Sequence, residues 1–176
     1  MIGDLLVDVL AGAPAVTHVA AGMGPGPFTG LRVGIAAARA FALGRGLPVV
    51  PVVSHDAVAL GMLLSAAVAG SPEPSRFAVV TDARRREMAF TVYEGIDDDG
   101  LPVRRDEPAL AQRDDLDARL ADLGARRLDA ASVPADMLAL VAARAVAAGR
   151  RVGPEEPLYL RPPDVAAGVV RKRVGV

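Results

Sequence analysis

The residues that could carry out catalytic chemistry are few in this chain of 176 residues. It has no cysteine, which excludes disulfides, thiolate metal ligands and cysteine nucleophiles. Its two histidines, His18 and His55, stand far apart, so the His-x-x-x-His spacing of a helical zinc site is absent. A metal-dependent hydrolase of that kind is therefore not predicted.

The consecutive residues Ser54, His55 and Asp56 have the three side-chain types of a serine hydrolase triad. Triads are assembled from separated positions, because consecutive side chains point in different directions. We expect Ser54 to cap the helix that follows it. Asp56 then lies in the first turn, where a negative charge suits the helix dipole.

The stretch GPGPFTG, residues 24–30, is a glycine-rich loop before a predicted helix. Free backbone N–H groups at such a position can bind phosphate. A P-loop requires a lysine after its last glycine, whereas Leu31 follows here, and Pro25 and Pro27 remove two N–H donors. We interpret this loop as a stiff turn between a strand and a helix.

Three short charged runs have ordinary interpretations. Asp97–Asp99 lacks the glutamate of an EF-hand loop, so we expect a solvated hairpin turn instead of a calcium site. The basic runs Arg84–Arg86 and Arg171–Arg173 are typical of solvated surface, with contact to tRNA as the alternative. A net charge of −1 argues against binding nucleic acid through overall charge.

The pattern of apolar residues predicts the elements that position these side chains. We expect helices at about 2–10, 31–43, 54–69, 114–123 and 134–148, and strands at 16–21, 47–54, 77–82, 87–94 and 101–105. Pro51 indicates an edge or a bend in its strand. The order predicts a mixed α/β sheet flanked by helices, with an N-terminal lobe at 1–70 and a C-terminal lobe at 71–176.

The second predicted helix carries small residues at every fourth position, namely Gly30, Gly34, Ala38 and Ala42. Such a ridge lets another helix approach closely. Glycine inside a helix costs about 1 kcal/mol relative to alanine, so Gly34 is present despite its low propensity. The ridge packs either on this chain's own sheet or first helix, or on a helix of another chain.

Three segments resemble the TsaB (YeaZ-like) family. GPGPFTGLRVG resembles its glycine loop and helix signature, TDARRREMAF its Asp-Ala-Arg hairpin, and PLYLRPPD its C-terminal Pro-x-Tyr-Leu-Arg segment. The resemblance implies the actin-like ATPase (ribonuclease H-like) fold. Family members begin with a strand hairpin that would precede Met1, so we expect this chain to lack the first strands, through truncation or a misassigned start.

The resemblance also implies a function. TsaB-like proteins are non-catalytic subunits that support a TsaD-like catalytic subunit in forming N6-threonylcarbamoyladenosine beside the anticodon of tRNAs reading ANN codons. A TsaE-like ATPase joins the assembly, and tRNA is contacted indirectly. We therefore expect no enzymatic activity, no cofactor and no metal. A metallopeptidase of the related glycoprotease-like superfamily is the alternative function.

TsaB-like proteins bind the TsaD-like subunit through their first two helices. On this sequence the expected partner-binding residues are Leu5, Leu6, Val9, Gly30, Leu31, Gly34, Ile35, Ala38 and Ala42. A chain exposing such a surface without its partner should form a homodimer. The sequence has no signal-peptide pattern and no apolar stretch long enough to span a bilayer, so we expect a soluble cytoplasmic protein.

Overall fold

The structure is a computed structural model and describes residues 11, 15–72, 75–83 and 85–161. The expected helix at 2–10, with Leu5, Leu6 and Val9, lies outside the described residues. The basic run at 171–173 lies outside them as well.

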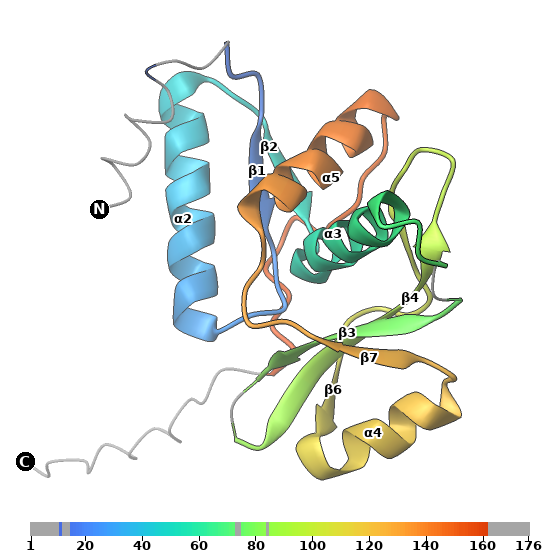
Figure 1. The fold of residues 1–176 in the computed structure, drawn as a ribbon. Coiled ribbons are helices and arrows are strands. Elements are labelled where there is room, and N and C mark those ends of the chain that lie inside the picture. The colour runs from blue at the N-terminus through green and yellow to red at the C-terminus, as the bar shows by residue number, and fades with distance from the viewer. Residues whose placement is uncertain (1–10, 12–14, 73–74, 84, 162–176) are drawn as a thin grey trace, which may run out of the picture.

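A small parallel sheet forms the first layer (Figure 1). Strands β1 (Val19–Gly22) and β2 (Val49–Val52) pair in parallel, and helix α2 (Phe28–Arg45) connects them. The helix starts earlier than predicted, because Pro27 occupies the N-cap position, and Gly46 ends it with a φ of 63°. Among the described residues, the other side of β2 carries a single bridge, from Val52 to Val152, so Pro51 lies at an edge as expected.

A five-stranded sheet forms the second layer. Its strands are β3 (Phe77–Asp82), β4 (Glu87–Ile96), β5 (Pro102–Arg104), β6 (Ala109–Gln112) and β7 (Arg126–Asp129). β4 pairs antiparallel with β3, β5 and β6, whereas β7 pairs in parallel with β3. The sequence did not predict β6 and β7, because four residues are too few for an apolar alternation to be recognised. Charged residues supply three of the four positions of β7.

Both faces of β4 are buried, and successive side chains alternate between them. Met88, Phe90 and Val92 pack on helix α4 (Arg113–Asp122). Tyr93, on the other face, packs with Leu63 of helix α3 (Ser54–Val68). The second sheet therefore lies between the two helices, and α3 packs on its other side against α5 (Figure 1).

Helix α5 (Ala135–Ala147) returns to the first layer, where it packs on α3, β1 and β2. Val141 and Ala145 share a core there with Leu60 and Val52. The division into lobes at residue 70 stays a prediction. Helix α5, from beyond residue 70, completes the core of the first layer.

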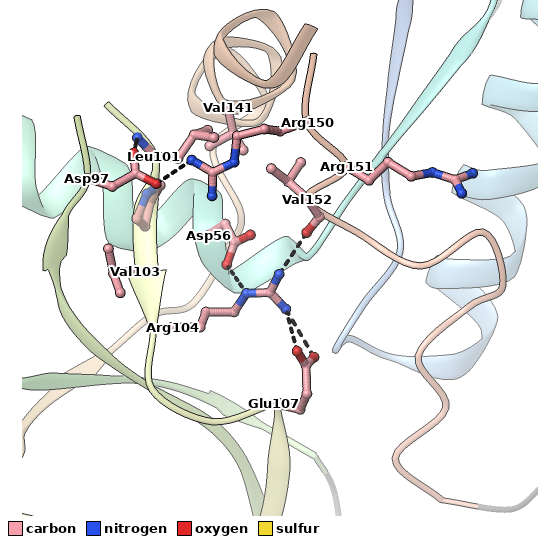
Figure 2. A pocket seen from close by; sticks show the side chains of 11 residues that line it. Asp56, Asp97, Leu101, Val103, Arg104, Glu107, Val141, Arg150, Arg151 and Val152 are labelled. Carbon is pink, nitrogen blue, oxygen red and sulfur yellow. Dashed lines mark hydrogen bonds and ion pairs between the residues drawn. The ribbon is translucent and has the colours of Figure 1, made fainter. Parts of the chain in front are cut away.

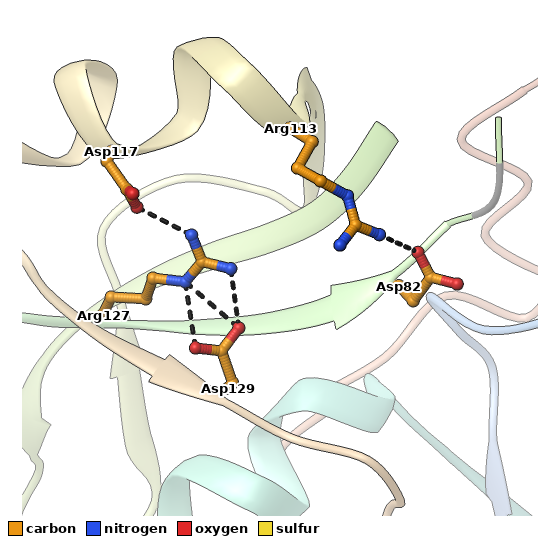
Figure 3. A network of polar contacts seen from close by, with 5 residues as sticks. All are labelled: Asp82, Arg113, Asp117, Arg127 and Asp129. Carbon is orange, nitrogen blue, oxygen red and sulfur yellow. Dashed lines mark hydrogen bonds and ion pairs between the residues drawn. The ribbon is translucent and has the colours of Figure 1, made fainter. Parts of the chain in front are cut away.

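Several surface ion pairs lie on the outer side of the second layer (Figure 3). Arg127 of β7 binds Asp129 and also Asp117 of α4, with Nη–Oδ distances of 2.8 and 2.7 Å. Arg113 binds Asp82 at 2.9 Å, which ties the start of α4 to the end of β3. Exposed pairs of this kind contribute about 0–1 kcal/mol each, so the packing of Leu116 and Leu120 holds α4 in place.

The segment after α5 runs along β2 and then along the glycine loop. Val152 bridges to Val52, and the Leu158 N–H donates to the Met23 carbonyl at 2.7 Å. Gly153 passes so close to β2 that a Cβ atom there would lie 2.7 Å from the Pro51 carbonyl oxygen. A side chain at this position is therefore incompatible with the observed backbone approach.

We expect Gly153→Ala to lower the free energy of unfolding by about 1–3 kcal/mol, because the new methyl group meets backbone atoms that cannot rotate away. Urea unfolding measures the change. Gly26→Ala is the matched control, since in the described part of the chain a Cβ at Gly26 meets no atom within 4 Å. Equal stability of the two variants would show that the segment does not lie against β2 in solution.

Candidate functional site

Ser54 joins the start of α3 to the glycine loop. The Gly24 N–H donates to Ser54 Oγ at 3.0 Å, and the Ser54 N–H donates back to the Gly24 carbonyl at 2.7 Å. The expected capping role is therefore wrong: Val53 occupies the N-cap position, and no side chain caps the helix. Ser54 is buried, and its hydroxyl oxygen accepts a bond from the loop because the loop passes directly over the helix start.

His55 joins the same helix end to the second sheet. Its side chain is completely buried, with Nδ1 2.8 Å from the Thr91 hydroxyl and Nε2 3.0 Å from the Thr81 hydroxyl. Burial lowers the pKa of His55 to about 3, so the ring is neutral at physiological pH. With both ring nitrogens occupied by threonines of β3 and β4, His55 does not serve as a base for Ser54.

Asp56 is the third buried polar residue of this helix end. The Tyr93 hydroxyl donates to Asp56 Oδ1 at 2.8 Å, and Arg104 Nε lies 3.4 Å from the same oxygen. Burial raises the pKa of Asp56 to about 6, although the Arg104 charge and the Tyr93 hydrogen bond oppose this rise. Burial and the neighbouring Asp56 carboxylate raise the pKa of Tyr93.

These three residues form a hub that joins the glycine loop to β3, β4 and β5. Their consecutive positions make this possible, because neighbouring side chains at a helix start diverge toward different elements. The interpretation as a catalytic triad is excluded by the geometry: Ser54 binds the glycine loop, whereas His55 and Asp56 bind separate side chains of the second sheet. Thr81, Thr91, Tyr93 and Arg104 complete the hub, and no spacing in the sequence indicated them.

Arg104 extends the hub to the segment after α5 (Figure 2). Besides Asp56, its guanidinium binds Glu107 at 3.0 Å and the Val152 carbonyl at 2.9 Å. These groups line a cavity of about 250 Å³ that also includes Arg150. One arginine thus links α3, β5 and the chain that runs along β2.

The acidic turn at the end of β4 borders this cavity. Asp97 accepts N–H bonds from Asp99 and Leu101, and Arg150 binds both carboxylates at 2.5 and 2.7 Å. The hairpin turn predicted here is present, but an arginine from beyond α5 neutralises it, so it is not simply solvated. Among the described residues, no group of three or more histidine, aspartate or glutamate side chains could hold a metal ion.

The C-terminal segment brings the three family-like motifs together. The Tyr159 ring lies 5.1 Å from the Phe28 ring, and Arg32 Nε donates to the Tyr159 hydroxyl at 3.0 Å. Two residues further, Arg161 forms an ion pair with Glu87 of the β3–β4 hairpin. The glycine loop, the hairpin and the Pro-x-Tyr-Leu-Arg segment, far apart in sequence, therefore meet in one region.

The partner-binding residues predicted on α2 divide into two groups. Ile35 and Ala42 are buried, and Leu31 and Ala38 are half-buried beside them, against β1 and Met23; Gly30 and Gly34 are exposed. A four-residue step advances about 40° beyond a full helical turn, so the ridge winds from the exposed face into the core. The partner interface as a whole stays a prediction. Of the residues predicted for it on α2, Gly30 and Gly34 are the exposed ones.

Several known proteins are similar to this chain. Residues 1–120 match the family model of TsaD, tRNA N6-adenosine threonylcarbamoyltransferase. An uncharacterized protein of Mycobacterium tuberculosis is 37% identical over 90% of this chain and 71% of its own length. The TsaB protein of Haemophilus influenzae, a tRNA threonylcarbamoyladenosine biosynthesis protein, is 42% identical over 59 residues, which are 34% of this chain and 25% of that protein.

Solved structures agree with these matches. YeaZ from Pseudomonas aeruginosa has a TM-score of 0.64 at 26% identity, over 91% of this chain and 82% of that chain. A crystal structure of an uncharacterized protein with similarity to the peptidase YEAZ from Pseudomonas aeruginosa has a TM-score of 0.65 at 26% identity, over 92% of this chain and 81% of that chain.

The chain belongs to the TsaB (YeaZ-like) family. Its fold is therefore the actin-like ATPase (ribonuclease H-like) fold that the resemblance implied. The family places the chain in tRNA threonylcarbamoyladenosine biosynthesis. In this TsaB-like chain the family motifs converge on the C-terminal segment, and the polar hub lies beside them. Among the described helices, none combines the length and apolar character needed to cross a membrane.

Proposed function

We propose that this chain is a non-catalytic subunit that supports a TsaD-like catalytic subunit in forming N6-threonylcarbamoyladenosine beside the anticodon of tRNAs reading ANN codons. A TsaE-like ATPase joins the same assembly, in the cytoplasm. Family membership supports the pathway, and the exposed face of α2 supports the role of a docking subunit.

One part of the exposed surface of α2, which lies between Arg39 on one side and Arg45 at the helix end, carries no charged side chain. It comprises Gly30, Val33, Gly34, Ala36, Ala40, Leu43 and Gly44. Leu43 is 85% exposed and Val33 is 54% exposed, which is costly for apolar side chains in water. Arg32 and Arg39 lie on its border, where they bind Tyr159 and the Glu155 carbonyl.

Glycines on this face leave room for a partner helix. A Cβ atom at Gly30 or Gly34 meets no atom of the described residues within 4 Å. Small residues allow two helices to pack at the short end of the usual 8–10 Å interaxial distances. The single observation that supports the proposed role is this uncharged part of α2 with its open glycines. The family resemblance agrees, because α2 belongs to the helix pair through which TsaB-like proteins bind their partner.

Gly34→Leu should weaken binding to the TsaD-like subunit by about tenfold to a hundredfold, because overpacking costs about 1–3 kcal/mol at a close helix contact. The melting temperature of the isolated chain should not fall, since a Cβ at Gly34 meets no atom within 4 Å among the described residues. Calorimetric titration with the TsaD-like subunit measures the affinity. Gly34→Ala should bind almost normally, and Ala118→Leu, on the exposed side of α4, is the control.

If Gly34→Leu binds the TsaD-like subunit as tightly as the unchanged chain, this face is not the interface. Light scattering on the isolated chain tests the related expectation of a homodimer, for which a mass near 18.1 kDa would be the contrary result. The metallopeptidase alternative predicts stoichiometric zinc or iron and peptide cleavage by the purified chain. Either finding would overturn the proposed non-catalytic role.

A further inference from the structure

A cluster of planar side chains stands on the surface where the motifs meet. Phe28 is 40% exposed and Tyr159 is 37% exposed. The Arg32 guanidinium lies over the Phe28 ring, 4.0 Å from its centroid, and donates to the Tyr159 hydroxyl. Because the three side chains contact one another, the cluster offers pre-formed aromatic and guanidinium groups at the start of α2, with the two ring planes tilted by 44°.

The tip of the β3–β4 hairpin presents arginines in an unusual backbone conformation. Arg85 and Arg86 have φ values of 51° and 62°, in the left-handed region that favours glycine, and both residues are exposed. Residues held in such conformations cluster at functional sites. The Arg86 carbonyl accepts the Arg113 N–H at 2.7 Å, which anchors the tip to the start of α4.

The C-terminal segment connects the aromatic cluster to the base of the hairpin. Tyr159 belongs to the cluster, and Arg161, two residues later, pairs with Glu87 at the base of the hairpin. Figure 1 places the start of α2, the C-terminal segment and the hairpin tip on the same side of the molecule. Glu87 and Asp82 are acidic here, but Arg161 and Arg113 neutralise them.

Charge is distributed unequally along β4. The arginine tip lies before its first residue, Glu87, and the acidic turn with Asp97 and Asp99 lies after its last, Ile96. The chain as a whole has a net charge of −1, so the basic end is a local feature. The aromatic cluster lies near the basic end of β4, because Arg161 of the same segment pairs with Glu87 at the start of that strand.

We propose that this surface, made of Phe28, Arg32, Tyr159, Arg85 and Arg86, binds single-stranded RNA. Unpaired bases stack on aromatic rings and on arginine planes, while arginines beside them contact phosphates. The family's place in tRNA modification makes RNA the partner that this chemistry fits. The contact is direct, in contrast to the indirect one expected from the family, and it is independent of the α2 interface.

Fluorescence anisotropy with a labelled single-stranded RNA of about twelve nucleotides, within the length that one single-strand-binding fold covers, tests the proposal. Tyr159→Leu should weaken binding by about tenfold to a hundredfold, because a stacking ring is lost. Tyr159→Phe keeps the ring and should bind nearly as well. Arg86→Gln should weaken binding and reduce its salt dependence by about one phosphate contact.

Arg126→Gln, which removes the same charge from the exposed edge strand β7, is the control and should leave RNA affinity unchanged. Melting temperatures establish that each variant is folded. Absence of saturable binding, or an equal loss in Arg126→Gln, would overturn the proposal. The proposal is also wrong if Tyr159→Leu weakens binding to the TsaD-like subunit and not to RNA. Gly34→Leu should retain RNA binding, so the two proposals fail separately.

Discussion

Replacing Arg104 by methionine will lower the free energy of unfolding by about 3–5 kcal/mol at pH 7, the usual cost of removing one partner from a buried ion pair. Arg104 is the cation beside Asp56, whose carboxylate is buried. Without it, Asp56 must either keep an uncompensated charge or take up a proton. Arg104→Met also frees the Val152 carbonyl, so the segment along β2 loses one of its ties.

A double-mutant cycle separates the ion pair from the other contacts of Arg104. Asp56→Asn removes the buried charge and keeps an oxygen that can accept the Tyr93 hydrogen bond. Arg104→Met combined with Asp56→Asn should therefore be less damaging than the sum of the two single changes. Urea unfolding at pH 7 measures all three variants. Strict additivity would mean that Arg104 acts through Glu107 and Val152 alone.

Acid will destabilise the chain through His55, by about 5 kcal/mol between pH 7 and pH 3. The pKa of His55 is lowered by burial from 6.5 to about 3 in the folded state. Below pH 6.5 the unfolded chain therefore binds a proton that the folded chain does not. The free energy of unfolding consequently decreases as the pH decreases. The loss continues until the pH reaches about 3, where the folded state is protonated as well.

Asp56 acts in the opposite direction over part of this range. Its pKa is raised from 3.8 to about 6 in the folded state, so the folded chain binds the extra proton between these values. The contribution of Asp56 to the free energy of unfolding is about 3 kcal/mol. This contribution is fully present below pH 3.8 and is lost as the pH rises through 6. Between pH 6 and pH 4 the two groups nearly cancel.

The His55→Asn variant separates the two contributions. Without His55, stability should rise as the pH falls from 6 to 4, because Asp56 alone then determines the slope. The unchanged chain should be nearly flat over that range and lose stability below it. Urea unfolding at several pH values provides both curves. Parallel curves for the two proteins would show that His55 does not stay neutral in the folded state.

Much of the fold followed from local patterns. A strand was predicted at 87–94 and is present as β4, which α4 and α3 cover on its two faces. Glycines and prolines marked most element ends within a few residues. The strands β6 and β7 were missed, because their pairing to β4 and β3 holds them and their own residues show no strand pattern.

The sequence by itself determined the family, because the glycine loop, the hairpin and the C-terminal segment are runs of specific residues that can be read without a structure. It also excluded cysteine chemistry and a histidine zinc motif. It misjudged Ser54 as a helix cap and did not identify the partners of His55 and Asp56, since the partners of a buried polar side chain come from elements far along the chain. Only the tertiary structure places Thr81, Thr91, Tyr93 and Arg104 around that helix start.

Tertiary structure also decided which side of α2 faces water. The four-residue ridge from Gly30 to Ala42 reads as one stripe in sequence, but its rotation around the helix buries one end and exposes the other. The meeting of Phe28, Arg32 and Tyr159 was equally invisible, because more than a hundred residues separate the two segments. Local sequence specifies elements and turns through short-range sterics, whereas contacts between distant segments depend on how the whole chain packs.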